Sequence, residues 1–317
     1  MSRPTAIGWR AALLCRMRLV APLCGLGLVL PALLSQLPAE ISGTTVWLLD
    51  LAAHWQWVFA PALVLSAGLA TLADRRWALL LTLLGLPWLT ASALLPAASG
   101  ALPAFTIASA NVHMDNQDVG PLALWLAQEK PDVVVVLEVT AIYAQGLQLL
   151  DAYPHHQIAA QDNPFGIALL SRHPLTDVRT VQDADGIPHI DARLTWQGRK
   201  IRVLAVHPMP PISTAFAASR DRQLAAWARG AGLQPTLLAG DLNATPWSRA
   251  FTGLDALGLR RATGLAPTWP AALRGWSGVP IDHVLASRHW RRIESWRGPD
   301  LGSDHAPVLA RVALTGD

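Results

Sequence analysis

The sequence predicts a chain of two parts, with three transmembrane α-helices in residues 1–100 and a mixed α/β domain in residues 101–317. Three observations lead to this fold class. The chain has 317 residues, of which 52% are hydrophobic and 15% are charged, a composition that excludes a disordered protein. Three long windows within the first hundred residues contain no charged side chain. After Pro103, short apolar runs alternate with amphipathic segments.

The uncharged windows cover residues 19–39, 51–73 and 77–98 in approximate bounds. Each reaches the roughly 20 residues that an α-helix needs to cross ~30 Å of hydrocarbon. Three such helices in succession would need a large partner to cover them in water, so we expect them to span a bilayer. A cleaved signal peptide is the alternative for the first window, because arginines precede it. No small-x-small cleavage site follows that window cleanly, which favours a retained anchor.

Positive charges beside the windows predict the orientation of the chain. These charges are Arg3, Arg10, Arg16, Arg18, Arg75 and Arg76. The loop between the first two windows contains no Lys or Arg. All six arginines can lie in the cytoplasm only if the N-terminus is inside and the third span leads outward. We therefore expect a multi-pass protein of the inner (plasma) membrane, with its α/β domain on the periplasmic or extracellular side.

The net charge and the positions of the cysteines limit the functions that residues 101–317 can have. The formal net charge of +3 comes entirely from the first hundred residues, because the remaining chain contains 19 basic and 19 acidic residues. Global charge therefore gives no support to a nucleic-acid binder. Both cysteines, Cys15 and Cys24, lie in the N-terminal part. The rest of the chain has neither a disulfide nor a thiolate metal site.

The elements of the domain follow from its apolar runs. Strands are predicted at residues 105–110, 133–137, 167–170, 201–206, 236–239, 281–285 and 307–312. A helix begins after Pro121, between the first two strands, because proline is favoured in the first turn of a helix. Residues 213–230 form a second predicted helix. The sequence thus predicts a mixed α/β domain of ordinary size.

Polar residues recur at the ends of these predicted strands. They are Asn111, Glu138, His207, Asp241, Asn243, Asp282, His283, Asp304 and His305. A sheet that carries polar groups at several strand ends can assemble one site from distant parts of the sequence. Carboxylate and amide oxygens suit a hard cation such as Mg²⁺, and histidines bind or protonate phosphate oxygens. Divalent-metal phosphoester hydrolysis is therefore the predicted reaction type.

Seven short segments, in order, resemble the motifs of the endonuclease/exonuclease/phosphatase superfamily with the deoxyribonuclease I-like fold. They are Ser109-Ala-Asn111-Val, Pro131-Asp-Val-Val-Val-Val-Leu-Glu138, Phe165-Gly-Ile-Ala-Leu-Leu-Ser171-Arg172, Val206-His207, Gly240-Asp241-Leu-Asn243, Ile281-Asp282-His283-Val and Gly302-Ser303-Asp304-His305. The resemblance implies a four-layer α/β/β/α sandwich of two mixed β-sheets.

The resemblance also implies roles for individual residues. The metal ligands would be Glu138, Asn111 and Asp304, and the cofactor Mg²⁺, with Mn²⁺ as an alternative. The catalytic residues would be Asp241, Asn243, His305, Asp282 and His207. In that set, Asp241 and Asn243 orient and activate the attacking water, and Asp282 holds His305 against the phosphate. Asn111, Arg172 and Trp269 are assigned to substrate binding, although Trp269 is equally consistent with a core residue.

The substrate class stays open at this stage. Three N-terminal helices before this domain resemble a membrane-anchored bacterial subgroup, which implies a lipid-linked or small phosphorylated substrate. The alternative is an extracytoplasmic endonuclease or exonuclease acting on DNA, with a basic cluster at Arg288, Arg291, Arg292 and Arg297. A catalytically inactive membrane scaffold is an alternative of another class. The expected partners are the phosphoester substrate and the bilayer, and no protein partner can be inferred.

Overall fold

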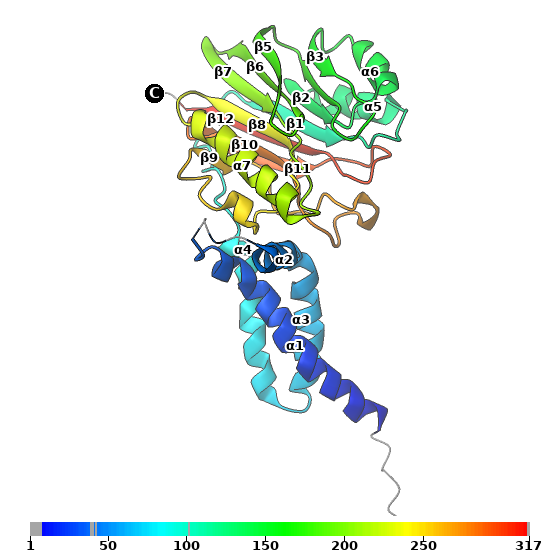
Figure 1. Cartoon of the computed structure of the whole chain (residues 1–317), viewed down its shortest axis with the longest axis vertical. Coiled ribbons are helices and arrows are strands. Elements are labelled where there is room, and N and C mark those ends of the chain that lie inside the picture. Colours follow the sequence, from blue (N-terminus) through cyan, green and yellow to red (C-terminus); the bar gives the residue numbers. More distant parts are fainter. Residues whose placement is uncertain (1–7, 39–40, 42, 101, 316–317) are drawn as a thin grey trace, which may run out of the picture. The chain divides into compact units, whose positions relative to one another are not determined.

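The computed structural model describes residues 8–38, 41, 43–100 and 102–315. The chain divides into two compact units (Figure 1). The first contains the described residues up to Ala91 together with Trp247–Arg249, and the second contains Ser92–Pro246 and the described residues from Ala250 onward.

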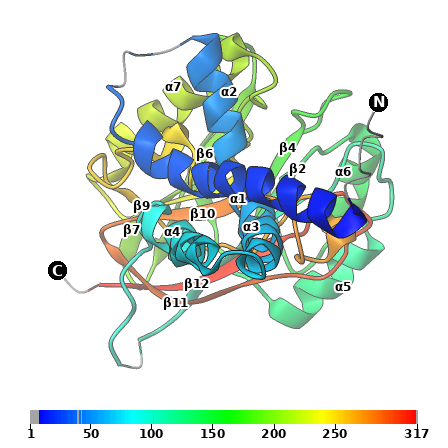
Figure 2. The same cartoon turned by 90° about the horizontal axis from the view of Figure 1, so that it is seen from below.

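The first unit is helical. Its elements are α1 (Trp9–Leu34), α2 (Thr44–Ala53), α3 (Gln56–Thr71), a 3₁₀ helix (Arg75–Gly85) and α4 (Leu86–Thr90). Helix α1 packs against α3 (Figure 2). Leu28 of α1 and Leu63 of α3 are fully buried in the core that these helices share. Gly27 permits this close approach, because a Cβ there would lie 2.6 Å from the ring of Phe59. The side chain of Gln56 reinforces the contact by donating to the Gly27 carbonyl at 2.9 Å.

The segment Trp247–Arg249 belongs to this first unit although it lies within the sequence of the domain. The carboxylate of Asp50 in α2 accepts hydrogen bonds from Ser248 Oγ at 2.9 Å and from the backbone N–H of Arg249 at 2.7 Å. The indole of Trp247 donates to the Pro87 carbonyl at 2.8 Å. These bonds attach the segment to α2 and α4.

The prediction of three transmembrane α-helices is wrong for the described residues. Helix α1 alone is long and apolar enough to cross a membrane. The second window is broken between α2 and α3, and the two helices meet at a bend of 69°. They could form a span only as one bent pair. The polar side chains of His54 and Gln56 lie at this break.

The third window does not form a continuous α-helix. It consists of the 3₁₀ helix and α4, and from Ser92 onward the chain belongs to the second unit. The backbone N–H groups of Leu95 and Ala98 donate to the carbonyls of Arg261 and Arg292, at 2.6 and 2.8 Å. Residues that donate to a sheet edge are not available to extend a helix.

The second unit consists of two six-stranded sheets with helices (Figure 1). The first sheet has the order β11-β12-β1-β2-β4-β3 and the second β5-β6-β7-β8-β10-β9. The strands are β1 (Phe105–Asn111), β2 (Val133–Leu137), β3 (His155–Ala159), β4 (Ile167–Ser171), β5 (Leu175–Gln182), β6 (Pro188–Trp196), β7 (Arg199–Ala205), β8 (Thr236–Asp241), β9 (Leu259–Arg261), β10 (Asp282–Ser287), β11 (Trp290–Arg297) and β12 (Val308–Leu314). The helices are α5 (Gly120–Glu129), α6 (Ala141–Gln148) and α7 (Thr214–Ala231).

Three apolar cores hold this unit together. The largest lies between the sheets and contains Phe105 and Val135 of the first sheet with Ile190 and Val203 of the second. A second core lies between the first sheet and helices α5 and α6, and a third between the second sheet and α7. Each sheet is mixed, because β1 runs parallel to β2 and β7 parallel to β8, whereas the other pairs are antiparallel. The prediction of an α/β sandwich of two mixed sheets is confirmed.

Sequence explains the helix starts in this unit. Ser213 and Thr140 precede α7 and α6, and their side chains accept hydrogen bonds from the N–H groups of Phe216 and Tyr143. Pro121 lies in the first turn of α5, as predicted.

Candidate active site

Two buried carboxylates and one histidine meet where β8 ends and β10 begins. Asp241 and Asp282 are register partners in these antiparallel strands, and they are 2% and 1% exposed. The Nδ1 atom of His305 lies 2.9 Å from Asp282 Oδ2, and its Nε2 atom lies 3.7 Å from Asp241 Oδ2. The imidazole of His305 is therefore held between two carboxylates.

His207 follows β7 and faces the same cluster. Its Nε2 atom lies 3.6 Å from Asp241 Oδ2, and its ring packs against the ring of Phe165, with centroids 5.5 Å apart. Because β7 and β8 are parallel neighbours, the residues that follow them emerge at one edge of the sheet. The second histidine thus lies on the other side of Asp241 from Asp282.

The backbone around Asp241 depends on a glycine. A Cβ at Gly240 would lie 1.8 Å from the carbonyl oxygen of Val206, so only glycine allows β8 to approach the end of β7 this closely. This approach brings Asp241 to His207. The first position of the Gly-Asp-Leu-Asn segment therefore requires glycine for a structural reason.

Asn243 supports Asp241 through a left-handed turn. Its φ is 49°, a conformation that asparagine tolerates better than most residues. Its backbone N–H donates to Asp241 Oδ1 at 2.8 Å, and its side-chain amide donates to the Pro208 carbonyl at 3.0 Å. The buried guanidinium of Arg220 donates to the Asn243 carbonyl at 2.8 Å. Asp241 is left with Oδ2 directed toward the two histidines.

Glu138 follows β2 with a φ of 62°, an unusual backbone conformation for a glutamate. Its two carboxylate oxygens accept hydrogen bonds at 2.9 Å from Asn111 Nδ2 and from the backbone N–H of Met114. Asn111 ends β1, which is parallel to β2, so both residues lie at the same edge of the first sheet. In this arrangement Asn111 donates to Glu138, and its own Oδ1 accepts from the His113 N–H.

The cluster changes the pKa values of its members. Burial and the negative charges of Asp282 and Glu138 together raise the pKa of Asp241 to about 7, against the lowering effect of the His305 charge and the Asn243 hydrogen bond. Burial lowers the pKa of His207 to about 4, so this imidazole is neutral at pH 7. Burial alone would lower the pKa of His305, but the charges of Asp282 and Asp241 and the hydrogen bond to Asp282 outweigh it and raise the pKa to about 10.

The donor set at this edge fits a divalent cation. Carboxylates dominate it, and each oxygen of Glu138 keeps a second lone pair beside its hydrogen bond. Ligand atoms of Asp241, Asp282 and His305 lie within 4.8 Å of one another. Such oxygen-rich sets suit Mg²⁺ or Mn²⁺.

Asp304 and Trp269 lie together at the exposed side of the site. The indole Nε1 of Trp269 donates to Asp304 Oδ2 at 3.0 Å, and Asp304 is solvent-exposed. The bond involves only Oδ2, so Asp304 Oδ1 can serve as a ligand for a cation. Trp269 is half-buried.

Arg172 is the predicted substrate-binding residue that the structure does not bring to this edge. It follows β4, which runs antiparallel to β2, and its backbone N–H donates to the carbonyl of Asp132, which precedes β2. Arg172 therefore lies at the end of the sheet opposite to Glu138. Its guanidinium donates to the Lys130 carbonyl at 3.2 Å.

His283 lies in the core beside the site. Its Nε2 atom is 3.0 Å from the carbonyl oxygens of both Ala244 and Pro280, and its Nδ1 atom is 3.2 Å from Thr263 Oγ1. The carbonyl oxygens require the proton on Nε2. Burial and the positive charge of Arg261 lower the pKa of His283 to about 4.

Several groups of the site were missed in the sequence. Thr268 Oγ1 accepts from the backbone N–H of Asp282 at 3.2 Å, and Ser303 Oγ accepts from that of His305 at 3.0 Å. Met114 contributes only its backbone N–H to Glu138. Backbone donors carry no side-chain signal, whereas Ser303 belongs to the Gly-Ser-Asp-His segment and was identifiable there.

Solved structures show the same fold. An endonuclease/exonuclease/phosphatase from Beutenbergia cavernae DSM 12333 is 21% identical with a TM-score of 0.55, over 67% of this chain and 72% of that chain. An AP endonuclease from Archaeoglobus fulgidus is 19% identical with a TM-score of 0.52, over 65% and 98%. D. rerio TDP2 complexed with single strand DNA product is 17% identical with a TM-score of 0.53, over 66% and 98%. A search of curated proteins found no match.

The family assignment comes from the sequence itself. Residues 108–305, more than half of the chain, match the model of the Endonuclease/Exonuclease/phosphatase family. This range begins in β1 and ends at His305, so it contains every residue of the cluster described above. Members of this family hydrolyse phosphoester bonds as nucleases or phosphatases, typically with a divalent metal ion. The chain belongs to the endonuclease/exonuclease/phosphatase family, and it is an enzyme of the phosphoester-hydrolysing class.

Proposed function

We propose that this chain is a membrane-attached, divalent-metal-dependent phosphoesterase whose reaction is carried by Asp241, Asp282, His305 and His207. The observation that supports this most directly is the imidazole of His305, held at 2.9 Å by one buried carboxylate and facing another at 3.7 Å. A purely structural histidine does not need two buried acids, whose desolvation is costly.

Asp241 is the group placed to accept a proton from the attacking water. Its Oδ1 atom is held by the Asn243 N–H, which fixes the carboxylate and leaves Oδ2 directed into the cluster. A base fixed in this way meets the first requirement of general base catalysis, which is geometry. Asn243 acts on the reaction by holding Asp241.

His305 is the group placed to stabilise the phosphate in the transition state. Its Nδ1–H donates to Asp282, so its Nε2–H is free to donate to a phosphate oxygen that enters beside Asp241. A cationic donor gains strength as negative charge grows on that oxygen. His207, neutral by burial, provides a second imidazole on the other side of Asp241.

Glu138 and Asp304 would hold Mg²⁺ or Mn²⁺, with Asn111 orienting the Glu138 carboxylate by hydrogen bonding. The cation, when bound, neutralises phosphate charge and makes the phosphorus more electrophilic. Asn111 is accordingly proposed as a residue that positions a ligand, and Trp269 as a wall that holds the Asp304 side chain. Arg172 is not part of this proposal, because it lies at the opposite end of the sheet.

The first unit supports attachment to a membrane. Helix α1 is apolar and long enough to cross a bilayer, and Arg10, Arg16 and Arg18 lie in its first part. Arginines at the start of such a helix favour a cytoplasmic N-terminus. We therefore propose that the chain is anchored in the plasma membrane with its second unit outside the cytoplasm. An enzyme held at that surface meets lipid-linked phosphates and small phosphoesters, the substrate class we favour.

A nuclease is the second candidate, favoured by the structural similarity to D. rerio TDP2 complexed with single strand DNA product and to an AP endonuclease. The balance of 19 basic and 19 acidic residues after residue 100 argues against strong binding of a polyanion. The two candidates share the cluster and differ in substrate.

A substrate panel separates them. The purified full chain in a neutral detergent with Mg²⁺ is given phospholipids, a polyprenyl pyrophosphate, a small phosphodiester and plasmid DNA, and product release is measured. We expect hydrolysis of a lipid-linked or small phosphoester, abolished by a chelator. Hydrolysis of DNA alone would replace the lipid proposal with the nuclease. If Asp241→Asn keeps the parental activity on every substrate that the parent hydrolyses, the proposed catalytic site is wrong.

A further inference from the structure

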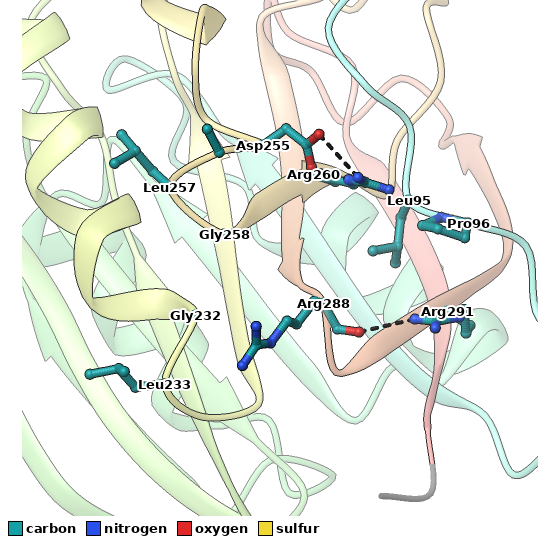
Figure 3. Close-up of a pocket in the computed structure, with 11 residues that line it drawn as sticks. Leu95, Pro96, Gly232, Leu233, Asp255, Leu257, Gly258, Arg260, Arg288 and Arg291 are labelled. Atoms are coloured by element: carbon teal, nitrogen blue, oxygen red, sulfur yellow. Dashed lines mark hydrogen bonds and ion pairs between the residues drawn. The ribbon is translucent and has the colours of Figure 1, made fainter.

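A cationic pocket lies at the opposite end of β10 from the active site (Figure 3). Its volume is about 470 Å³, and Arg288, Arg291, Arg260, Gly258 and Leu95 are among the residues that line it. Asp282 begins β10 and Ser287 ends it. Six residues of strand extend roughly 20 Å at about 3.3 Å each, so this pocket is separate from the catalytic cluster.

Three arginines line the pocket, and they differ in whether a carboxylate neutralises them. The charge of Arg260 is neutralised by Asp255 (Figure 3). The Nη2 atom of Arg260 donates to Asp255 Oδ2 at 3.0 Å. Within the described part of the chain, no carboxylate pairs with Arg288 or Arg291. Unpaired guanidinium groups that line a concavity attract anions, and their planar N–H groups match phosphate oxygens.

Arg291 is already fixed in place. Its Nη1 atom donates to the carbonyl oxygens of Arg288 at 3.0 Å and Trp290 at 2.9 Å. These bonds orient the guanidinium, and its remaining N–H groups stay available to a ligand. A donor ordered in advance loses less conformational entropy when it binds.

The wall of the pocket is built from two glycines in backbone contact. Gly258 has a φ of +102°, and a Cβ there would lie 3.0 Å from the Cα of Gly232. Gly232 follows α7, whose C-terminal end carries about half a negative charge. Two full positive charges outweigh this partial charge, so the pocket favours an anion.

The surroundings of the pocket favour an anion that is attached to a lipid. Leu95 and Pro96 line it, so apolar side chains lie beside the guanidinium groups in its lining. Leu233 at its rim is 88% exposed, which is costly in water but favourable at a bilayer surface. We propose that this pocket binds the phosphodiester headgroup of an anionic membrane lipid. The proposal rests on the membrane attachment proposed above.

The test measures binding, independently of hydrolysis. The full chain in an uncharged detergent with a chelator is titrated by calorimetry with short-chain phosphatidylglycerol and, separately, with short-chain phosphatidylcholine. The double variant Arg288→Gln/Arg291→Gln is compared with the control Arg179→Gln/Lys200→Gln, which removes the same charge from exposed positions on β5 and β7. We expect the pocket variant to bind phosphatidylglycerol at least about tenfold more weakly, because each lost contact is a charge-assisted hydrogen bond. The control should bind it like the parent, and phosphatidylcholine should bind weakly to all three.

Other outcomes overturn the proposal. Equal binding of both lipids, or binding of phosphatidylglycerol that the pocket variant leaves unchanged, would remove the headgroup site. Binding of inorganic phosphate or of a short DNA duplex that depends on Arg288 and Arg291, without preference for phosphatidylglycerol, would assign the pocket to another ligand. Hydrolysis by the pocket variant should equal that of the parent in detergent, so a wrong catalytic proposal and a wrong pocket proposal give different results.

Discussion

The side chain of His305 lies between the carboxylates of Asp282 and Asp241, and this geometry was partly predictable. Polar residues at strand ends predicted one site, and of these the structure brings Asp241, Asp282 and His305 together, because β8 and β10 are paired with Asp241 opposite Asp282. Arg172 shows why the prediction failed elsewhere. An apolar run reveals a strand but not its direction, and β4 runs antiparallel to β2.

At Asp241, replacement by asparagine keeps the shape of the side chain but removes the base. General acid–base catalysis contributes typically about 10²- to 10⁴-fold, so kcat of Asp241→Asn should fall by that range with KM nearly unchanged. Steady-state kinetics on the substrate found by the panel measures this. The matched control is Asp177→Asn, an exposed aspartate of β5. Parental kcat in Asp241→Asn would make Asp241 a turn residue only.

His283 predicts a pH dependence of stability. Its pKa is lowered from 6.5 to about 4 in the folded protein, so the unfolded chain binds more protons between these values. Stability from this residue is fully present above pH 6.5 and is lost as the pH falls toward 4. In His283→Gln the dependence of the free energy of unfolding on pH should therefore be shallower there, by up to about 1.4 kcal/mol per pH unit.

Unfolding of the full chain in detergent, followed by circular dichroism from pH 7 to pH 4, provides the measurement. His156→Gln, at an exposed position of β3, is the control and should keep the parental slope. Identical slopes in the parent and in His283→Gln would show that His283 is not the buried neutral group described here.

The strands differ in how visible they are in sequence. Fully buried strands such as β2 and β8 were predicted because each contains a run of apolar residues, Val133–Leu137 in β2 and 237–239 in β8. Strand β5 was missed, since most of its residues are exposed and it forms an edge. Strand β6 alternates buried and less buried residues with a period of two, a signal that the sequence contained but that its charged residues obscured. Three arginines of the basic cluster, Arg291, Arg292 and Arg297, lie in β11, and Arg288 lies in the turn before it.

The junction of β7 and β8 supports a prediction about Gly240. A Cβ at this position meets the Val206 carbonyl oxygen at 1.8 Å, so Gly240→Ala must displace one strand end from the other. We expect a loss of about 1–3 kcal/mol in stability and a decrease in kcat, because His207 and Asp241 lie directly beyond this contact. Gly264→Ala, where a Cβ meets no atom within 4 Å, is the control for both measurements. Parental kcat and melting temperature in Gly240→Ala would contradict the contact.

For the whole molecule, the sequence predicted a boundary between residues 100 and 101, whereas the compact units of the structure divide at Ala91 and Ser92, with Trp247–Arg249 in the first unit. The number of spans was not predictable from uncharged windows. A hydropathy pattern does not reveal the bend of 69° between α2 and α3. It also does not reveal that helix α4 ends at Thr90 and that the chain then forms hydrogen bonds with a sheet edge. Length and apolar composition set an upper limit on spans, and backbone hydrogen bonding determines which windows remain helical.

Orientation is testable with a reporter fused after Asp317. The arginines near the start of α1 favour a cytoplasmic N-terminus, so a reporter that works only outside the cytoplasm should be active. A matched fusion of a reporter that works only inside the cytoplasm should be inactive. The reverse pattern would place the second unit in the cytoplasm.

Metal-dependent hydrolysis is the central claim, and Glu138→Gln tests it most directly. Glutamine keeps the size of the side chain but removes the negative charge that faces Asn111 Nδ2 and the Met114 N–H. The measurement is the rate of product release by the full chain as a function of Mg²⁺ concentration, for the parent and for Glu138→Gln. We predict no turnover of the parent in excess chelator, recovery on adding Mg²⁺, and a variant whose rate is strongly reduced and needs more Mg²⁺ while its melting temperature stays close to the parental one. Full turnover of the parent in excess chelator, or an unchanged Mg²⁺ dependence in Glu138→Gln, would contradict the mechanism.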